Sequence, residues 1–359
     1  MKQFAFLLMM SIVILFSSCK KDDPSPAGPV LQPKKGIYVL SEGSFGGNNT
    51  RLGYYTLSGN SFSPDFFLQQ NPGAAGLGDI GNDMVLYGGK LYIVMNVTSQ
   101  VTVLNAATGA LIRRIDFRNG TADKLPRYAT AARGKVFVTS YDNTVSVVDT
   151  SSLAIVQSIA TGANPDGIAA YGDYLYVANS GSFNFPDVDS TVSVINLNTM
   201  TEVKKITVGL NPNKIEVSAN GDVYVTSYGN FSSVPASVAV INSSDNTLKA
   251  QLGAGFAYSH VRMNGDLAYF YNNYGGSGVA KVYNTRTGTV VRNEFVTDGT
   301  SIDTPYGINI DEESGEVFVC DAKDFVTAGT VYCFNADGTL KYSFSTAPGI
   351  NPNKVVFNR

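Results

Sequence analysis

The sequence predicts an all-β protein built as a seven-bladed β-propeller, and three observations support that prediction. First, one element recurs along the chain, marked by prolines separated by 39, 47, 93 and 47 residues, the third gap spanning two repeats: Pro126, Pro165, Pro212, Pro305 and Pro352. Second, each repeat reads as four short strands. Third, the final segment is a lone inner strand whose partners lie at the start of the chain. A repeat of this length is typical of propeller blades.

The four strands are clearest in the repeat that follows Pro165. Residues 168–171 form the predicted inner strand, and after a Gly-Asp turn residues 174–179 form the second. Residues 191–196 alternate apolar and polar side chains, and residues 203–208 direct two lysines outward before a glycine ends the blade. The same pattern begins at Met84, Ala129, Ile168, Ile215, Val261 and Ile308. These starts give six blades.

The seventh blade is split between the two ends of the chain. Residues 349–357 supply its inner strand, and residues 36–40, residues 51–57 and the segment ending Phe66-Phe67-Leu68 supply the other three. The last blade is therefore closed by N-terminal strands plus the C-terminal strand, which removes the open sheet edge. This places the propeller at residues 36–359.

The N-terminal residues predict export and lipidation. A charged Lys2, an apolar run over 4–16 and Ser17-Ser18-Cys19 have the layout of a secretory signal, and the run is too short to span a membrane. Cysteine after small residues resembles a bacterial lipobox, so we expect removal of residues 1–18 and acylation of Cys19. Residues 20–23, Lys-Lys-Asp-Asp, resemble the signal that directs Bacteroidetes lipoproteins to the outer face of the outer membrane; a solvated tether is the alternative. The proline-rich stretch makes residues 19–35 a linker.

Charge and cysteine content narrow the classes of partner. Without Lys2, 25 basic side chains (26 minus 1) accompany 29 acidic ones, which argues against a nucleic-acid partner. Contact with the membrane is expected through the lipid anchor only. Cys320 and Cys333 fall on adjacent predicted strands slightly out of register, so a disulfide between them stays open.

Motifs for catalysis or for a metal are missing from the sequence. It has one histidine, His260, for which packing is the favoured role, and it lacks the nucleophile-elbow, zinc-protease, phosphate-loop and paired-cysteine motifs. Asp187 and Asp189 could supply oxygens to Ca²⁺, but their spacing does not continue as a calcium loop, and solvated carboxylates are the simpler interpretation. We therefore expect no catalytic residue, no cofactor and no bound metal.

Aligning the blades predicts two polar rings on one face of the propeller. The position after each proline, or its equivalent, reads Asn82, Arg127, Asp166, Asn213, Ser259, Tyr306 and Asn353. The end of each second strand reads Ser41, Asn96, Ser140, Asn179, Ser227, Asn272 and Asp321. Turn capping is an alternative for these residue types, above all in the second ring. Arg127 and Tyr306 are not turn formers, which favours an asymmetric ligand at the first ring.

The loops after the second ring add aromatic groups beside amides, a combination that suits a large ligand with apolar faces and an amide-rich rim. Packing of these aromatics over neighbouring blades is the alternative. The predicted ligand-binding residues from rings and loops together are Asn82, Asn96, Arg127, Tyr141, Asp166, Asn179, Phe183, Phe185, Asn213, Tyr228, Phe231, Tyr258, Asn272, Tyr274, Tyr306 and Asn353.

Three segments of the third repeat carry a resemblance to a known family. Residues 164–168 (Asn-Pro-Asp-Gly-Ile), 175–179 (Leu-Tyr-Val-Ala-Asn) and 191–195 (Thr-Val-Ser-Val-Ile) resemble the YVTN-type surface-layer propeller repeat, over about residues 36–359. The absence of tryptophan counts against a WD40 propeller.

The chain also resembles the corrinoid-binding propeller lipoproteins of Bacteroidetes. This resemblance is carried by the lipoprotein signal that ends at Cys19, by the repeat and by residues 89–96 (Gly-Lys-Leu-Tyr-Ile-Val-Met-Asn). That resemblance implies capture of cobalamin (vitamin B12) as ligand at the cell exterior and its delivery to a TonB-dependent outer-membrane transporter. A non-enzymatic scaffold or adhesin that binds protein or glycan is the runner-up. A propeller lyase or hydrolase is third.

Overall fold

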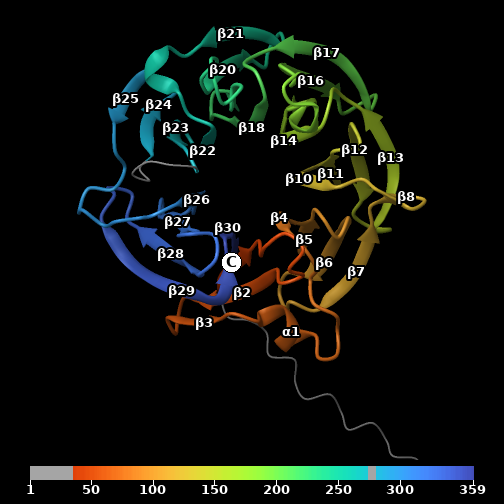
Figure 1. Cartoon of the computed structure of the whole chain (residues 1–359), viewed down its shortest axis with the longest axis vertical. Coiled ribbons are helices and arrows are strands. Elements are labelled where there is room, and N and C mark those ends of the chain that lie inside the picture. Colours follow the sequence, from red (N-terminus) through yellow and green to blue (C-terminus); the bar gives the residue numbers. More distant parts are fainter. Residues whose placement is uncertain (1–34, 274–279) are drawn as a thin grey trace, which may run out of the picture. The chain divides into compact units, whose positions relative to one another are not determined.

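The computed structural model describes residues 35–273 and 280–359, and it confirms the seven-bladed propeller (Figure 1). Strand accounts for 54% of the chain and helix for 3%, so the protein is all-β. Seven four-stranded antiparallel sheets form the blades. The predicted signal segment, Cys19, the tether up to residue 34 and Tyr274 lie outside the described residues.

The blades follow one another along the chain. Blade one comprises β4 (Gly81–Tyr87), β5 (Lys90–Met95), β6 (Gln100–Asn105) and β7 (Leu111–Asp116). Blade two comprises β10 (Pro126–Ala132), β11 (Lys135–Ser140), β12 (Thr144–Asp149) and β13 (Ala154–Ala160). Blade three comprises β14 (Pro165–Tyr171), β15 (Tyr174–Asn179), β16 (Thr191–Asn196) and β17 (Thr201–Thr207). Blade four comprises β18 (Pro212–Val217), β19 (Asp222–Ser227), β20 (Ser237–Asn242) and β21 (Thr247–Gln251).

Blades five and six have the same order of strands. Blade five comprises β22 (His260–Asn264), β23 (Leu267–Tyr271), β24 (Lys281–Asn284) and β25 (Thr289–Arg292). Blade six comprises β26 (Pro305–Ile310), β27 (Val317–Asp321), β28 (Ala328–Phe334) and β29 (Leu340–Ile350). Short elements decorate the connections: the ribbon β8 (Arg118–Asn119) and β9 (Ala122–Asp123), and the single 3₁₀ turns η1 (Ser182–Asn184) and η2 (Ala254–Phe256).

Blade seven is split as predicted, with one correction. Its strand order is β3 (Ser61–Ser63), β2 (Arg51–Thr56), β1 (Gly36–Ser41) and β30 (Pro352–Asn358). The expected outer strand ending at Phe66-Phe67-Leu68 is wrong, because the outer strand ends at Ser63 and Phe66–Gln70 forms the short helix α1. In the helix both phenylalanines are buried in the core. In a β-strand, adjacent side chains point to opposite faces, so one of the two would have been exposed.

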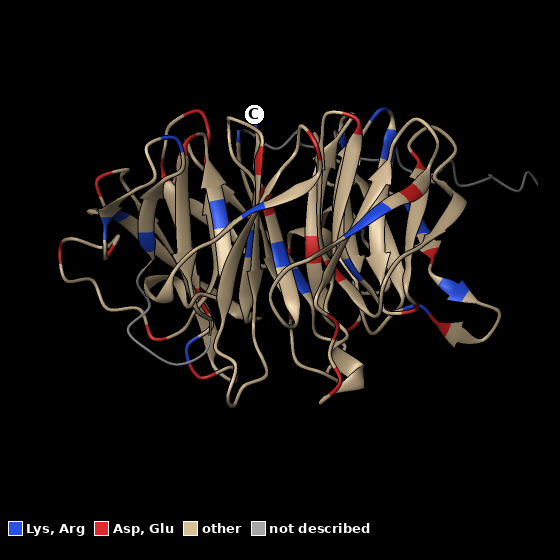
Figure 2. Cartoon of the chain, turned by 90° about the horizontal axis from the view of Figure 1, so that it is seen from above, with Lys and Arg blue, Asp and Glu red and all other residues tan. Residues whose placement is uncertain are grey.

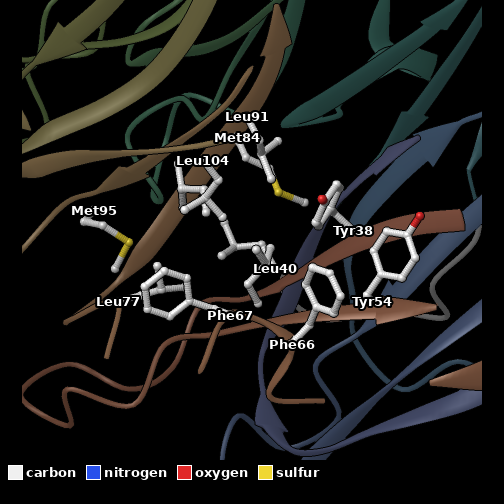
Figure 3. Packing of buried hydrophobic residues seen from close by; sticks show 12 residues of the cluster. Tyr38, Leu40, Tyr54, Phe66, Phe67, Leu77, Met84, Leu91, Met95 and Leu104 are labelled. Carbon is white, nitrogen blue, oxygen red and sulfur yellow. The ribbon is translucent and has the colours of Figure 1, made fainter. Parts of the chain in front are cut away.

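The core lies between neighbouring blades. Figure 3 shows the cluster that joins blades seven and one, in which Tyr38 packs edge-on against Tyr54 with ring centroids 4.9 Å apart. Phe66 stacks on Tyr54 at 4.8 Å, and Phe67 is 2% exposed beside it. Burying such large rings on both faces of each sheet contributes roughly 2 kcal/mol per side chain to folding.

Four inner strands start with the same local geometry. The residue before the proline has a left-handed backbone in four blades, with φ of +53° at Leu125, +42° at Asn164, +56° at Asn211 and +54° at Asn351. Asparagine tolerates that conformation better than most residues, which accounts for the recurring Asn-Pro pair. Directly after the proline the pairing register shifts by a β-bulge, as between Pro126 and Ala129. The bulge re-aims the side chains that follow it.

The two remaining cysteines are buried thiols. Cys320 lies opposite Val331 and Cys333 opposite Phe318, so the two side chains are out of register and no disulfide joins them. Burial raises the pKa of each thiol to about 12. Over 35–273 and 280–359, helices long and apolar enough to cross a membrane are absent.

Candidate ligand-binding face and channel

The structure brings both predicted rings to one end of the propeller. Strand register pairs the proline that opens an inner strand with the residue that closes the second strand: Pro126 with Ser140, Pro165 with Asn179, Pro212 with Ser227, Pro305 with Asp321, and Pro352 with Ser41. We call this end, where the inner strands begin, the proline face. Figure 2 shows the blades from the side, with acidic and basic residues interspersed along them.

The first ring is a network that links neighbouring blades. Arg127 Nε donates to Asp166 Oδ1 at 2.9 Å, and Arg127 Nη1 donates to Asn82 Oδ1 at 2.5 Å. Asn353 Nδ2 donates to the carbonyl oxygens of Gly81 and Asn82 at 2.9 and 3.2 Å. The side chains of Arg127 and Asp166 are 19% and 6% exposed, so water screens their ion pair weakly. These contacts fix the ring residues of blades seven, one, two and three before any ligand arrives.

The second ring caps strand ends. Asn179 is fully buried, and its Oδ1 accepts the Gly162 N–H at 3.0 Å. Asn96 Nδ2 donates to the Pro126 carbonyl at 3.0 Å, and Asn272 Oδ1 accepts a backbone N–H at 2.8 Å. These amides are engaged by the protein itself, so we assign Asn96, Asn179 and Asn272 the capping role that the sequence left open.

A third ring, absent from the predicted site, lies two residues after each proline position. Its members are Asp83, Tyr128, Gly167, Lys214, His260, Gly307 and Lys354. They line a central channel of about 930 Å³, to which the inner strands of all seven blades contribute. The β-bulge after the proline accounts for the extra position. A signal for it was present in the sequence, because Asp83, Lys214 and Lys354 place a charge at the same position of three inner strands.

The glycines of the third ring reflect close approach of inner strands. A Cβ atom on Gly307 would lie 2.0 Å from the carbonyl oxygen of Asn353, and one on Gly167 would lie 2.4 Å from that of Asn213. Any larger residue would push adjacent blades apart. The third ring therefore has no side chain at Gly167 and Gly307, and it has polar or aromatic side chains at its other five positions.

Most charges of the channel are paired. Lys354 Nζ lies 2.9 Å from Asp83 Oδ1, and Arg262 Nη1 lies 2.8 Å from Glu216 Oε1. At the end opposite the proline face, Arg359 pairs with Asp311. These pairs cross from blade to blade and neutralise the channel locally.

Unlike these charges, Lys214 forms no ion pair with a described residue. Its Nζ lies 3.5 Å from the centre of the Tyr128 ring, and no carboxylate oxygen of the described residues is within 4.0 Å of it. Burial lowers the pKa of Lys214 to about 8, and the charges of Asp166 and Asp83 only partly oppose that shift. The ammonium thus lies in a cavity with an aromatic face as its direct partner.

Glu42 lines the channel mouth from the loop after β1. Burial raises the pKa of its carboxyl, against a hydrogen bond from Tyr306 and the charges of Arg127 and Lys214. The mouth therefore offers a carboxyl group, a guanidinium and a phenol within one polar surface, which can bind amide donors and acceptors alike.

His260 is 4% exposed and packs against the ring of Tyr271 with centroids 5.1 Å apart. Its Nδ1 lies 3.0 Å from Ser259 Oγ, which lies 3.0 Å from Asn272 Oδ1. Burial, aided by the charge of Lys214, lowers the pKa of His260 well below its ordinary value, so the ring is neutral at pH 7. These contacts support the packing role.

Four phenylalanines project from the proline face. Phe45, Phe183, Phe185 and Phe231 are 83%, 67%, 58% and 70% exposed, and each lies on a loop between the second and third strands of its blade. We call these four residues the phenylalanine crown. Exposed rings gathered at one end of a molecule mark a binding surface more often than scattered apolar residues do.

Two crown residues pack on tyrosines of the proline face. Phe183 packs edge-on against Tyr141 with centroids 4.7 Å apart, and the Arg127 guanidinium lies 4.8 Å from the centre of Tyr141. Phe231 packs against Tyr228 at 5.5 Å and holds a left-handed backbone with φ of +54°. Such a conformation is strained for a bulky residue and tends to occur at functional sites.

Tyr258 and Asp189 are engaged by contacts within the protein. Tyr258 stacks on Phe270 at 6.1 Å and packs, partly buried, against the core between blades four and five. Asp189 Oδ1 accepts the backbone N–H groups of Ser190 and Thr191, at 2.6 and 3.0 Å, which occupies the oxygen that a Ca²⁺ ion would use. Within the described ranges, groups of three or more metal-ligating side chains were not found.

Comparison with known families identifies the propeller. A model described as "Domain of unknown function (DUF5074)" matches residues 35–358. The chain belongs to the DUF5074 family. A search of curated proteins found no match to this DUF5074 sequence.

Solved structures share the fold of this DUF5074 propeller. A quinonprotein alcohol dehydrogenase-like protein from Bacteroides thetaiotaomicron is 16% identical, with a TM-score of 0.65 over 91% of this chain and 79% of its own. A candidate 6-phosphogluconolactonase from Bacteroides fragilis is 13% identical, with a TM-score of 0.64 over 93% of this chain and 99% of its own. Identities this low show the fold alone.

The isolation of Lys214 has a consequence for stability that can be measured. Its pKa is about 8 in the folded protein and 10.5 when unperturbed. Below pH 8, Lys214 is charged in both the folded and the unfolded protein, and the folded protein bears the full free-energy cost of burying the ammonium. Between pH 8 and 10.5, Lys214 is neutral in the folded protein but still charged in the unfolded one, so that cost disappears. Lys214→Met should therefore raise the free energy of unfolding at pH 7 by about 2 kcal/mol, allowing for partial exposure.

The pH profile separates charge from packing. Denaturant unfolding of wild type, Lys214→Met and the exposed outer-strand variant Lys204→Met should show the gain for Lys214→Met alone, and the gain should vanish above pH 10.5. A gain that persists at pH 11 would show that methionine merely packs better, and the assignment of a burial cost to the ammonium would be wrong.

Proposed function

We propose that this protein is a non-enzymatic capture protein that binds a corrinoid such as cobalamin on the proline face. The observation that carries the proposal is the phenylalanine crown above the mouth of a polar channel. A channel of about 930 Å³ is within the range of small-molecule sites.

The chemistry of the two surfaces is complementary. A corrinoid has flat apolar faces, which suit the exposed rings of Phe183, Phe185 and Phe231, and amide groups along its rim. The mouth offers hydrogen-bond partners for those amides in Arg127, Tyr306 and Asn353, together with Glu42. Hydrogen bonds within the first ring already hold Arg127 and Asn353 in place, so little side-chain freedom is lost on binding.

The same geometry favours binding over hydrolysis. The carboxylates of Asp83, Asp166 and Glu216 are each engaged by a cation at 2.8 or 2.9 Å, and a general base must be free to accept a proton. His260 is buried and its neutral ring serves packing contacts. These three carboxylates therefore offer no free general base for the chemistry that the descriptions of the structural relatives name.

The N-terminal sequence supports a place for the capture step. Acylation of Cys19 would anchor the chain in the outer membrane, and residues 19–35 would act as a tether. We propose that the propeller faces the cell exterior and passes its ligand to a TonB-dependent outer-membrane transporter.

Titration of the purified full-length protein with cyanocobalamin tests the proposal. Calorimetry should give one-site binding with a Kd of about 1 μM or tighter, and the pink ligand should co-elute with the protein in gel filtration. Absence of binding at about 100 μM ligand by both methods would overturn the corrinoid assignment. Binding to a glycan or protein array in its place would establish the scaffold or adhesin alternative.

A further inference from the structure

Lys214 is the exception among the cations of the channel. Arg127, Arg262, Lys354 and Arg359 each pair with a carboxylate of a neighbouring blade. Lys214 has the Tyr128 ring as its contact and, within the described ranges, no hydrogen-bond acceptor. Placing a charged donor in a cavity without an acceptor is costly, so its presence there calls for an explanation.

A second cation converges on the same ring. The Arg127 guanidinium carbon lies 5.4 Å from the centre of Tyr128, and Lys214 Nζ lies 3.5 Å from it. Arg127 uses Nε for Asp166 and Nη1 for Asn82, which leaves its Nη2 unused. Two nitrogen donors with positive charge thus meet at one aromatic side chain, Tyr128, whose hydroxyl also lacks a partner in the described part of the chain.

The nearby acids do not already fill this position. Asp83 is held by Lys354, Asp166 by Arg127 and Glu216 by Arg262. Glu42 accepts a hydrogen bond from Tyr306, and burial favours its neutral form. An incoming anion therefore meets Lys214 with little competition from the carboxylates around it.

From this arrangement we infer that the channel contains an anion subsite, in which Lys214, Arg127 and the Tyr128 hydroxyl bind an oxyanion such as a phosphate group. Arginine and lysine side by side are common phosphate partners, one as a fork of donors and the other as a point charge. The oxyanion could be a free inorganic ion or the phosphodiester of a corrinoid's nucleotide loop. The second source rests on the proposed function, whereas the first does not.

Sulfate is a suitable first probe, because it keeps its charge from pH 6 to 10. Thermal unfolding of the full-length protein is measured in sodium sulfate and in sodium chloride of equal ionic strength. A bound anion stabilises the folded state by mass action, so the wild type should show a saturable rise in Tm of about 2 °C or more. The outer-strand variant Lys204→Met should show the same rise, and Lys214→Met should lose it. General salting-out is linear in sulfate and cancels between the variants.

The pH dependence provides a second readout. The charged groups that face Lys214 are Asp83, Arg127, Asp166 and Glu216, with Glu42 at the mouth and the neutral His260 beside it. The sulfate-dependent rise should decline as the pH passes through about 8, where Lys214 loses its proton. A saturable rise that survives in Lys214→Met, or its absence from the wild type at pH 7, would overturn the subsite.

Corrinoids distinguish the two sources. Lys214→Met should weaken cyanocobalamin binding by about tenfold and leave dicyanocobinamide, which lacks the phosphodiester, unchanged. If Lys214→Met weakens binding of both corrinoids equally, or weakens binding of neither, the occupant of the subsite is a free ion. If the wild type binds no corrinoid at all, the proposed function fails while the sulfate result still decides the anion subsite.

Discussion

Arg127→Met is expected to lower the free energy of unfolding by about 3 to 5 kcal/mol, the cost of breaking a buried ion pair on one side. The substitution leaves the Asp166 carboxylate, on a side chain 6% exposed, without its cation. It also removes the donor to Asn82 and the support beneath Tyr141. Guanidinium unfolding followed by far-UV circular dichroism measures the loss, with an unchanged m-value as the sign that the folded state is intact.

A double-mutant cycle shows where that energy resides. The variant Arg127→Met/Asp166→Leu removes both charges and should recover most of the stability, because a buried pair replaced by apolar groups is often close to neutral. Lys249→Met, which breaks the more exposed pair with Asp222, serves as the control and should cost less than about 1 kcal/mol. A loss below 1 kcal/mol for Arg127→Met would mean that water in the channel hydrates Asp166 and that the first ring is less rigid than its contacts indicate.

The double variant Phe183→Ser/Phe231→Ser is expected to weaken cyanocobalamin binding by at least about 30-fold. A ring that stacks on a flat ligand contributes roughly 1–3 kcal/mol, and two crown residues on different blades contribute independently. Because both side chains are more than half exposed, their loss should leave the thermal midpoint nearly unchanged. Calorimetric titration of wild type and variant provides the comparison.

A control double variant removes exposed apolar side chains away from the proline face. Val156→Ser/Val203→Ser changes two half-exposed residues on the outer strands of blades two and three, at 55% and 52% exposure, and should bind the ligand as the wild type does. Unchanged affinity in the crown variant would move the ligand off the proline face. Equal loss in both double variants would point to a general effect on the protein.

The blade count followed from sequence because the proline repeat has a physical cause. A left-handed residue, a proline and a β-bulge start the inner strand, and this geometry tolerates few alternatives at Asn164-Pro165 or Asn211-Pro212. The split blade followed from the lone strand at residues 349–357. The helix that begins at Phe66 could not be predicted, because Phe66 and Phe67 fit the apolar pattern of a strand as well as that of a helix. Packing of Phe66 against Tyr54 favours the helix.

The site was predictable in part. Alignment on the prolines located the face and the exposed rings of Phe183, Phe185 and Phe231, because loop position follows from blade order. It missed the channel ring of Asp83, Lys214 and Lys354, since a bulge adds one residue that strict alternation does not anticipate. It also could not show that the amides of Asn179 and Asn82 are both used within the protein, because hydrogen-bond partners from distant segments are invisible in one sequence.

The split blade also determines when a site can exist during synthesis. Asn351 Nδ2 donates to the Gly43 carbonyl across 308 residues of chain, and Asn353 Nδ2 reaches Gly81 across 272. Glu42 and Asn353, both at the channel mouth, therefore meet only after nearly the whole chain has been made. Closing so long a loop is entropically costly and tends to slow folding. Ligand that binds across this junction would hold the two ends together, so the occupied ring should resist opening longer than the empty one.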